Sequence, residues 1–491
     1  MGVPTAVHGS RLSHSPSLTQ GLRSMNLWIG AGTVGSVGLA LLGTSLGAIP
    51  RPGDTGWWFN LPAGVSTLPK VGFYAAAALL IAGWVGVGVQ ARAGRLTVDR
   101  AWVILGFWGL PLLVGPPIFS RDIYSYIAQG LLANQGHNPY SVAPSALHDP
   151  RLLASIAAVW RDTASPYGPL FVMVSRATAT LSGGSLVVQV LAFRLLEMAG
   201  VATVMVSLPR LARRLGTDPG LALWLGALSP LALFSFIASG HNDALMVGLL
   251  VAGIVLAMEG RLAMGVALCA LAATIKLPAA VAIVFLAVDQ YRAAEAGQRR
   301  RIVAEAVVVP VVVVVGVTLA SGLGWTWLGP TALHVPTELR VLSSPSVALG
   351  TFLHSILQAV GVPVRLSPTV TATQLVCELV AVAGTVWLVC NAHKFDVVRL
   401  LGLALMLIVV GSPTVWPWYL MWGLTVLAAT PLQRSKVLAA VAGLAMLAVG
   451  PGGAPMLSGH AYLVLAPLLL AGVAWLIWDR HWRRVVTGCD A

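Results

Sequence analysis

Ionisable side chains occur at the ends of apolar segments at three places in this sequence. They are Asp122 with its neighbour Arg121, the run His241-Asn242-Asp243, and Lys276. Charged groups at membrane depth are costly, so they usually belong to a site that binds or reacts. A carboxylate can accept a proton, an ammonium can hold a phosphate, and imidazole and amide groups can bind hydroxyls. Together these residue types suit proton abstraction beside a phosphate leaving group.

Each motif also has a purely structural explanation. Asp122 follows an apolar segment and is well suited to cap a helix that starts there. Lys276 precedes a turn, where a lysine can extend its ammonium to lipid headgroups. Asn242 can cap the helix that follows it, but capping does not account for His241 and Asp243. We therefore favour function for these two residues and leave both explanations open for Asp122 and Lys276.

Aromatic residues accompany the polar motifs. Tyr124 lies two residues after Asp122, and Tyr167 and Trp418 each lie in a proline-containing turn. Tyrosine and tryptophan concentrate at membrane interfaces, and their flat rings also offer stacking faces to a ligand. Both explanations stay open for these three rings.

The composition places the motifs in a membrane. Of the 491 residues, 57% are hydrophobic and only 10% are charged, whereas a soluble domain carries about 25% charged residues. This excludes a disordered chain, a coiled coil and a disulfide scaffold, and it indicates a polytopic membrane protein. The four cysteines show no spacing typical of metal ligands.

Hydropathy predicts a series of spans, some short enough to be kinked or paired half-spans. The candidates are 27–49, 70–91, 101–119, 186–208, 219–238, 243–259, 262–275, 278–289, 302–320, 372–391, 399–411, 417–430, 437–450 and 460–478. The apolar segment 165–184 is short, has two prolines near its start and contains Arg176, so we expect it to lie at the membrane interface. Amphipathic segments at 122–134 and 150–160 are expected beside it.

The basic residues predict the orientation. With these spans, two thirds of the 30 Lys and Arg residues share the side of both termini, which the positive-inside rule makes cytoplasmic. Asp122, the His241–Asp243 run and Lys276 then emerge together on the external face. The net charge of +13 thus reflects topology, and its spread over many loops does not indicate a nucleic-acid partner.

The motifs that are absent also restrict the function. The sequence has no Walker loop, no GxGxxG after a strand and no HExxH. A reaction fed by a cytosolic nucleotide sugar is therefore disfavoured, and a donor held in the membrane fits better. A secondary transporter or lipid flippase is the rival class. Such proteins usually place ionisable residues near the membrane midplane, within repeated halves, and we find neither feature.

The chain resembles a known family over residues 100–430. In order, the shared motifs are SRDIYSYIAQGLLANQGHNPY, SPYGPLF, LARRLG, SGHNDALMVG, ATIKLPA and SPTVWPWYLMW. They resemble the actinobacterial polyprenol-phosphate-mannose-dependent α-1,6-mannosyltransferases of the lipomannan and lipoarabinomannan pathway. The resemblance implies the GT-C fold, an all-α bundle of about 12–14 transmembrane helices with interfacial helices in the first large external loop.

The resemblance also implies an activity and a site. Mannose would pass from decaprenyl-phosphate mannose to the 6-hydroxyl of a lipid-anchored α-1,6-mannan, with inversion, at the periplasmic face of the cell membrane. Asp122 would be the general base, and Lys276 and Arg121 would bind the donor phosphate. The residues expected to bind sugar or acceptor are His241, Asn242, Asp243, Tyr124, Tyr167 and Trp418. A polyprenyl-phosphate-arabinose-dependent arabinosyltransferase is the alternative within the same fold.

The motifs require no cofactor. A divalent metal is compatible with the resemblance, but position 121 is Arg, so the loop lacks the paired carboxylates that would support one. For the domain organisation we expect a disordered cytoplasmic tail over 1–26 and a cytoplasmic tail over 479–491. A single transmembrane domain is expected between them, over 27–478, with 120–185 as its periplasmic catalytic loop.

Overall fold

The computed structural model describes residues 18–49, 67–329, 344–431, 449–454 and residue 463. The elements before the long loop are α1 (Leu18–Leu46), α2 (Thr67–Arg92) and α3 (Val98–Val114). Those in the loop are α4 (Asp122–Asn134), η1 (Pro144–Leu147), α5 (Pro150–Ser155), α6 (Ala158–Arg161) and α7 (Pro169–Leu181). Next come α8 (Leu186–Arg214), α9 (Pro219–Gly226), α10 (Pro230–Ala232), η2 (Leu233–Ala238), α11 (Asp243–Met258), α12 (Leu262–Ala273), η3 (Leu277–Ala280), α13 (Val281–Ala293) and α14 (Ala296–Ser321). The last are η4 (Thr326–Leu328), α16 (Pro345–Ala359), α17 (Leu366–Cys390), α18 (Val397–Gly411), η5 (Pro417–Tyr419) and α19 (Leu420–Ala428).

These helices confirm the prediction of an all-α polytopic membrane protein. Five of the described helices, α1, α2, α8, α14 and α17, are long and apolar enough to cross a membrane. A sixth candidate is α9 with α10–η2, which is bent by 46° at a short break. Helices α11, α12 and α18 are apolar but shorter. The expected spans 437–450 and 460–478 lie almost wholly outside the described residues, so a total of 12–14 spans stays a prediction.

Two segments differ from the predicted boundaries. Helix α1 begins at Leu18, so residues 18–26 are helical instead of belonging to the tail expected over 1–26. Helix α16 has 15 residues, and no helix was expected there. The residues before Leu18 and the expected tail 479–491 lie outside the described residues.

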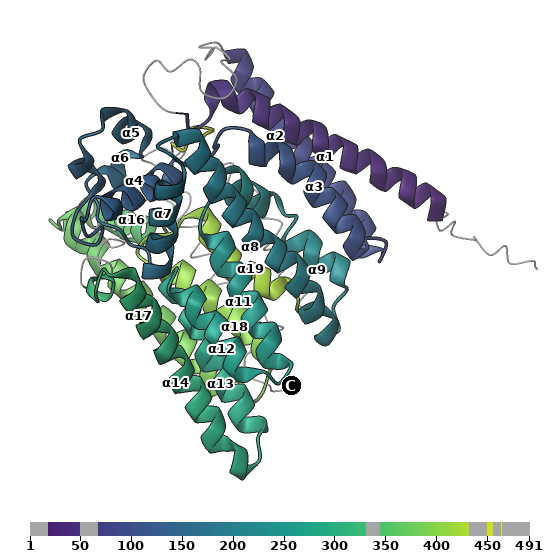
Figure 1. Cartoon of the computed structure of the whole chain (residues 1–491), viewed down its shortest axis with the longest axis vertical. Coiled ribbons are helices and arrows are strands. Elements are labelled where there is room, and N and C mark those ends of the chain that lie inside the picture. The colour runs from purple at the N-terminus through teal and green to yellow at the C-terminus, as the bar shows by residue number, and fades with distance from the viewer. Residues whose placement is uncertain (1–17, 50–66, 330–343, 432–448, 455–462, 464–491) are drawn as a thin grey trace, which may run out of the picture.

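The helices of the loop after α3 gather at one end of the bundle, and the turn between α13 and α14 lies at the other end (Figure 1). Helix α4 matches the predicted segment 122–134, and α5 and α6 cover most of 150–160. Helix α7 has 13 residues and lies in the segment 165–184, whose position at the membrane interface stays a prediction. It packs closely on α4, because a Cβ at Gly130 would lie 2.2 Å from the carbonyl oxygen of Ser175.

Helices α8 and α11 approach each other through glycine. A Cβ built on Gly248 would lie 2.6 Å from the carbonyl oxygen of Gly200, so a larger residue does not fit. Small residues allow such close packing of membrane helices. In the same interface, the buried carboxylate of Glu197 accepts a hydrogen bond from the backbone N–H of Leu245 at 3.0 Å. These contacts fix the first turn of α11, which carries Asp243.

The chain between α9 and α11 is irregular. Ser229 caps the short helix that starts at Pro230, accepting from the backbone N–H of Ala232. The π-helical turn η2 follows, a geometry that is rare and often occurs at functional sites. Gly240 then has φ +73°, a left-handed conformation that glycine adopts without strain. This turn brings His241 and its neighbours back to the bundle.

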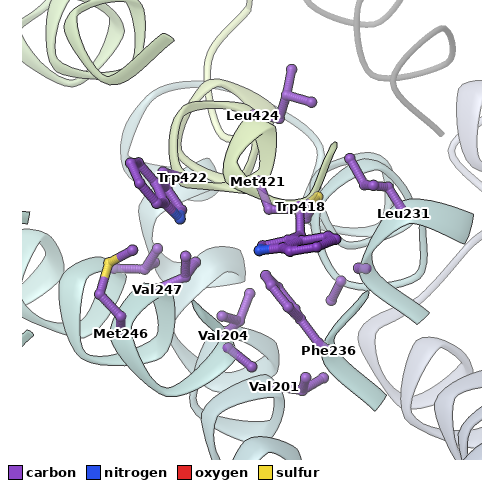
Figure 2. Close-up of a cluster of buried hydrophobic side chains, with 14 of the residues drawn as sticks. Val201, Val204, Leu231, Phe236, Met246, Val247, Trp418, Met421, Trp422 and Leu424 are labelled. Atoms are coloured by element: carbon purple, nitrogen blue, oxygen red, sulfur yellow. The ribbon is translucent and has the colours of Figure 1, made fainter. Parts of the chain in front are cut away.

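Apolar packing holds the start of α19 against α8 and α11. Figure 2 shows the rings of Trp418 and Trp422 pointing from η5 and α19 toward these two helices. The labelled members of this buried cluster are Val201, Val204, Leu231, Phe236, Met246, Val247, Trp418, Met421, Trp422 and Leu424. Side chains from four separate segments thus form a rigid support beneath the polar motifs.

Candidate active site

Asp122 is the first residue of α4 and is 7% exposed. Its backbone N–H donates to the hydroxyl of Ser120 at 3.1 Å. Its carboxylate oxygen Oδ1 accepts a hydrogen bond from the indole Nε1–H of Trp160 at 2.9 Å. The side chain therefore faces the interior and does not cap its own helix.

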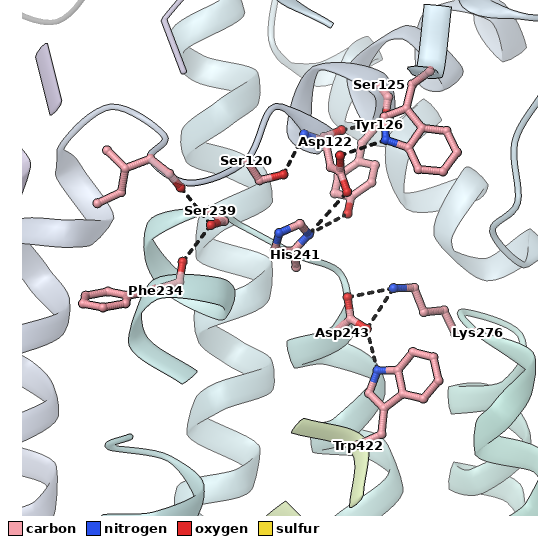
Figure 3. A network of polar contacts seen from close by, with 12 residues as sticks. Ser120, Asp122, Ser125, Tyr126, Phe234, Ser239, His241, Asp243, Lys276 and Trp422 are labelled. Carbon is pink, nitrogen blue, oxygen red and sulfur yellow. Dashed lines mark hydrogen bonds and ion pairs between the residues drawn. The ribbon is translucent and has the colours of Figure 1, made fainter. Parts of the chain in front are cut away.

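The other oxygen of Asp122 faces His241. Nδ1 of His241 lies 3.6 Å from Oδ2 of Asp122 and 3.5 Å from the hydroxyl of Tyr126. Figure 3 shows the three groups converging from α4 and from the turn before α11. Burial lowers the pKa of His241 well below its ordinary value, with the ammonium of Lys276 acting in the same direction. The imidazole is therefore neutral, and its contact with Asp122 is polar but not an ion pair.

Asp243 and Lys276 form a buried ion pair (Figure 3). Nζ of Lys276 donates to both carboxylate oxygens of Asp243, at 2.8 and 2.7 Å. The indole Nε1–H of Trp422 also donates to Oδ1 of Asp243, at 2.6 Å. Lys276 thus has a specific partner inside the protein and does not snorkel to headgroups.

Three aromatic rings surround this ammonium. Nζ of Lys276 lies 4.6 Å from the ring centroid of Tyr419, 5.6 Å from that of Tyr167 and 5.7 Å from that of Trp422. Rings at these distances attract a cation through their quadrupoles. Tyr167 therefore lies beside the charged pair. Its contact with a sugar stays a prediction.

Trp418 is only 3% exposed, so its ring is buried inside the protein and does not belong to a lipid-facing aromatic belt. Its indole stacks on the imidazole of His241, with ring centroids 3.7 Å apart and 20° between the planes. It also stacks on Trp416, with centroids 5.1 Å apart. The structure thus brings Trp418 to His241, as a support for the imidazole.

Arg121 and Tyr124 are engaged elsewhere. Arg121 donates from Nε to the carbonyl of Gly452 at 3.1 Å and from Nη1 to those of Ile49 and Ser155 at 3.0 Å each. The hydroxyl of buried Tyr124 donates to the carbonyl of Ala48 at 2.6 Å. Both side chains therefore join loops of the bundle, and these contacts do not favour the phosphate and sugar roles expected from the sequence.

Asn242 is completely buried, and neither atom of its side-chain amide has a hydrogen-bond partner. Nε2 of the adjacent His241 is likewise buried without a partner. A buried polar group left unpaired costs about 1–3 kcal/mol. Such groups are rare and call for a ligand or a water, so the run His241-Asn242 is equipped to bind hydroxyls.

Four contributing residues were not among the candidate site residues predicted from the sequence. They are Tyr126, Trp160, Tyr419 and Trp422. The signal for the two tryptophans is the N–H donor of indole, which usually has a partner when the ring is buried. Hydropathy also gave no sign of Glu197, a carboxylate inside a long apolar helix that holds the start of α11.

The electrostatics of the site favour proton transfer at Asp122. Burial raises the pKa of its carboxyl from 3.8 to about 6. Lys276 and the hydrogen bond from Trp160 oppose this rise, and the charge of Asp243 adds to it. Asp122 is therefore mostly ionised at neutral pH, yet it is a stronger base than a solvated carboxylate.

Among the described residues, no group of three or more His, Cys, Asp or Glu side chains is arranged to hold a metal ion.

The fold and the site define a class of protein. An all-helical membrane bundle carries, at one end, a buried carboxyl group of raised pKa, an ion pair and stacked aromatic rings, an arrangement suited to a membrane-embedded enzyme. Comparison with known proteins identifies the family. Residues 29–292 match the family model described as "Alpha-(1->6)-mannopyranosyltransferase, N-terminal domain", and residues 346–479 match the "MptB C-terminal domain" model. The chain belongs to this family and is an α-1,6-mannosyltransferase, which uses a mannose donor and a mannan acceptor.

Two relatives show how far the similarity extends. "Alpha-(1->6)-mannopyranosyltransferase A" of Mycobacterium tuberculosis is 30% identical over 401 residues, which cover 79% of this chain and 76% of the relative. "Alpha-(1->6)-mannopyranosyltransferase B" of Corynebacterium glutamicum is 27% identical over 438 residues, which cover 81% of this chain and 72% of the relative. No solved structure matches the chain.

Proposed function

We propose that this mannosyltransferase takes mannose from polyprenyl-phosphate mannose, of the decaprenyl type, and transfers it to the 6-hydroxyl of a lipid-anchored α-1,6-mannan. The observation that carries the proposal is the environment of Asp122. This buried carboxylate lies beside neutral His241 and the charge of Lys276, and its pKa is about 6. A base of this strength is charged at neutral pH and can still accept a proton from a hydroxyl that becomes acidic as it attacks.

The chemistry is a single displacement. The donor implied by the family resemblance is a β-linked mannosyl phosphate and the product is an α-mannoside, so the anomeric centre inverts. One base suffices, and no covalent enzyme intermediate forms. The 6-hydroxyl oxygen bonds to the anomeric carbon while Asp122 takes its proton. The bond from that carbon to the phosphate oxygen breaks, and the electron pair leaves with the lipid phosphate.

Lys276 is the group best placed to hold that phosphate. An ammonium has three N–H donors, and two of them serve Asp243. The third is free to bind a phosphate oxygen. In a site that excludes water, one such charge-assisted bond contributes more than it does in solvent. Asp243 and Trp422 then orient the ammonium, which is the role we assign to Asp243 in place of direct sugar binding.

The unpaired polar atoms of the turn before α11 suit the sugar. The amide of Asn242 offers donors and an acceptor, and Nε2 of His241 offers one more group. Because His241 is stacked on Trp418, its ring is held in one orientation. Hydroxyls of the mannosyl group would satisfy these atoms, and Tyr167 would border the same space beside Lys276.

We place the site on the periplasmic side, and the distribution of basic residues supports this choice. Arg299, Arg300 and Arg301 begin α14, at the end of the bundle opposite α4 to α7 (Figure 1). Under the positive-inside rule the basic end is cytoplasmic, so the end that holds Asp122 faces outward.

In a direct test, the purified protein is reconstituted in membranes and given radiolabelled decaprenyl-phosphate mannose as donor and a short α-1,6-mannoside as acceptor. The proposal predicts transfer of label to the acceptor 6-hydroxyl as an α-linked residue. Labelled decaprenyl-phosphate arabinose in the parallel reaction should give no product. Transfer from a nucleotide sugar in the absence of polyprenyl phosphate, or a β-linked product, would contradict the proposal.

A further inference from the structure

Trp160 has an unusual place for a residue in a loop. It belongs to α6, a helix of only four residues, yet its side chain is 5% exposed. Its indole N–H donates to Oδ1 of Asp122 at 2.9 Å, across 38 positions of sequence. Indole is a donor only, so it cannot take a proton from the carboxyl group or accept one in its place.

A second contact ties the same loop to the residue beside Asp122. Nη1 of Arg121 donates to the carbonyl of Ser155, the last residue of α5, at 3.0 Å. At the start of α4, Arg121 therefore holds α5 and Asp122 holds α6. The Trp160–Asp122 bond has its geometry fixed from both sides, since α5 and α6 cannot shift without breaking a contact.

We propose that Trp160 is a positioning residue for the transfer reaction, which selects Oδ2 of Asp122 as the proton-accepting atom and favours the charged form of that carboxylate. This inference rests on the proposed role of Asp122 as the base.

The selection follows from the two oxygens having different neighbours. Oδ1 has its lone pair directed to a fixed N–H donor, which restrains rotation of the carboxylate group. Oδ2 faces Nδ1 of His241 at 3.6 Å and receives no N–H from Trp160. Oδ2 is therefore the oxygen left to take the proton of an acceptor hydroxyl.

Trp160 stabilises the ionised form of Asp122 because the oxygen that accepts its hydrogen bond carries negative charge. A hydrogen bond to a carboxylate favours its ionised form, and burial disfavours that form. The N–H of Trp160 thus offsets part of the effect of burial on the pKa of Asp122. The other titratable groups that face or influence this carboxylate are His241, Asp243, Lys276, Tyr126, Tyr167 and Tyr419. Replacing Trp160 by Phe changes none of their charges, so a change in the titration of Asp122 reports the lost N–H.

The test is the pH dependence of kcat/KM for Trp160→Phe in the full-length protein. We expect the acidic limb to move to higher pH by about 0.5–1 unit. Activity at pH 5.5 then falls by about three- to eightfold relative to wild type and recovers toward a plateau near pH 8, with the donor KM little changed. The matched control is Trp327→Phe. Trp327 is 6% exposed and donates its indole N–H to the hydroxyl of Thr318 at 3.2 Å, away from Asp122, so its limb should not move.

A second variant separates the N–H from the ring. Benzothienylalanine at position 160 keeps the bicyclic shape and replaces N–H by sulfur, so it decides the question if Trp160→Phe does not fold. An unmoved limb, or an equal loss of activity at every pH, would overturn the positioning role.

The two proposals fail in different ways. If Asp122→Asn keeps near wild-type turnover, the base assignment is wrong and Trp160 loses its function with it. If Asp122→Asn is inactive and the Trp160 variants keep the wild-type limb, only the positioning role is wrong.

Discussion

Lys276 donates hydrogen bonds to both carboxylate oxygens of Asp243, at 2.8 and 2.7 Å, inside a cluster of aromatic rings. The pair joins the start of α11 to the turn that precedes η3. Its consequence is electrostatic. The charge of the ammonium is already balanced, so an incoming phosphate must use the third N–H or compete with Asp243.

The first prediction concerns this balance. Removing Lys276 alone leaves a buried, unpaired carboxylate, which costs about 3–5 kcal/mol and obscures any effect on catalysis. We therefore expect the informative variant to be the neutral double substitution Lys276→Met with Asp243→Asn. It should fold and show a donor KM raised by about 10- to 100-fold, the equivalent of one hydrogen bond to a charged group.

Asp243→Asn by itself is the control for that experiment. It leaves the ammonium buried without its counter-ion, which lowers stability, but the ammonium can still bind a phosphate, so in folded protein the donor KM should rise less than in the double variant. Steady-state kinetics with varied donor and fixed acceptor measure the difference. A change restricted to the acceptor KM in the double variant would rule out phosphate binding by Lys276.

The second prediction is the pH dependence of the wild-type enzyme. Because burial raises the pKa of Asp122 to about 6, the base is lost as pH falls through that value. A plot of kcat/KM against pH should show an acidic limb near pH 6, and a limb near pH 4 would show that the titrating group is a solvated carboxyl. The sign for stability is the reverse of that for activity. A raised folded-state pKa contributes stability below pH 4 that is lost as pH rises through 6, and Asp122→Asn should abolish this component.

The third prediction separates stability from function at Asn242. Its amide is buried and unpaired, so Asn242→Leu, which keeps the branching at Cγ and carries no polar atoms, should raise the midpoint of thermal unfolding. The same substitution removes the atoms assigned to sugar hydroxyls, and kcat/KM should fall by at least about tenfold. Thermal unfolding in detergent and transfer assays measure the two effects.

Asn138 provides the contrasting case. Its amide donates to the carbonyl of Leu323 and the hydroxyl of Thr326, both at 3.2 Å, and accepts from the N–H of Tyr140 at 3.0 Å. Asn138→Leu should therefore lower the unfolding midpoint. Equal destabilisation by the two substitutions would show that Asn242 is satisfied in the absence of substrate.

The fourth prediction concerns Glu197. Its Oε2 accepts from the N–H of Leu245 at 3.0 Å, so it holds the first turn of α11 and, through it, Asp243. Glu197→Gln keeps an acceptor oxygen and should retain most activity. Glu197→Ala should cost about 1–3 kcal/mol of stability and reduce turnover. Equal behaviour of the two variants would remove Glu197 from the support of the site.

Much of the site could be predicted because it depends on local sequence. Asp122, the His241–Asp243 run and Lys276 stand out as ionisable residues at the ends of apolar segments, and the structure brings Asp122 to His241 and Lys276 to Asp243. Helix α4 was predicted at its observed boundaries for the same reason, since its amphipathic pattern lies within one continuous segment.

The remaining features depend on tertiary packing. Tyr124 and Tyr126 are two residues apart, so a helix turns them to different faces by about 200°. Tyr126 contacts His241, and Tyr124 donates a hydrogen bond to the carbonyl of Ala48. The sequence does not predict which of the two faces of α4 is turned toward the site. The bond from Trp422 to Asp243 crosses 179 positions, beyond any local pattern.

Arg121 shows the same limit in another way. An arginine next to a candidate catalytic carboxylate suggests a phosphate ligand, but three backbone carbonyls from distant segments receive its N–H groups. Those carbonyls belong to loops whose positions only the folded chain defines.

The most direct test of the account is transfer from radiolabelled decaprenyl-phosphate mannose by Asp122→Asn. Asn keeps the size of the side chain and loses the base, so kcat/KM should fall by about 100- to 10,000-fold while the donor KM stays near wild type and the unfolding midpoint does not fall. Asp149→Asn is the matched control, because Asp149 is an exposed acid in the same loop that only caps α5. Near wild-type turnover by a folded Asp122→Asn protein would contradict the central claim.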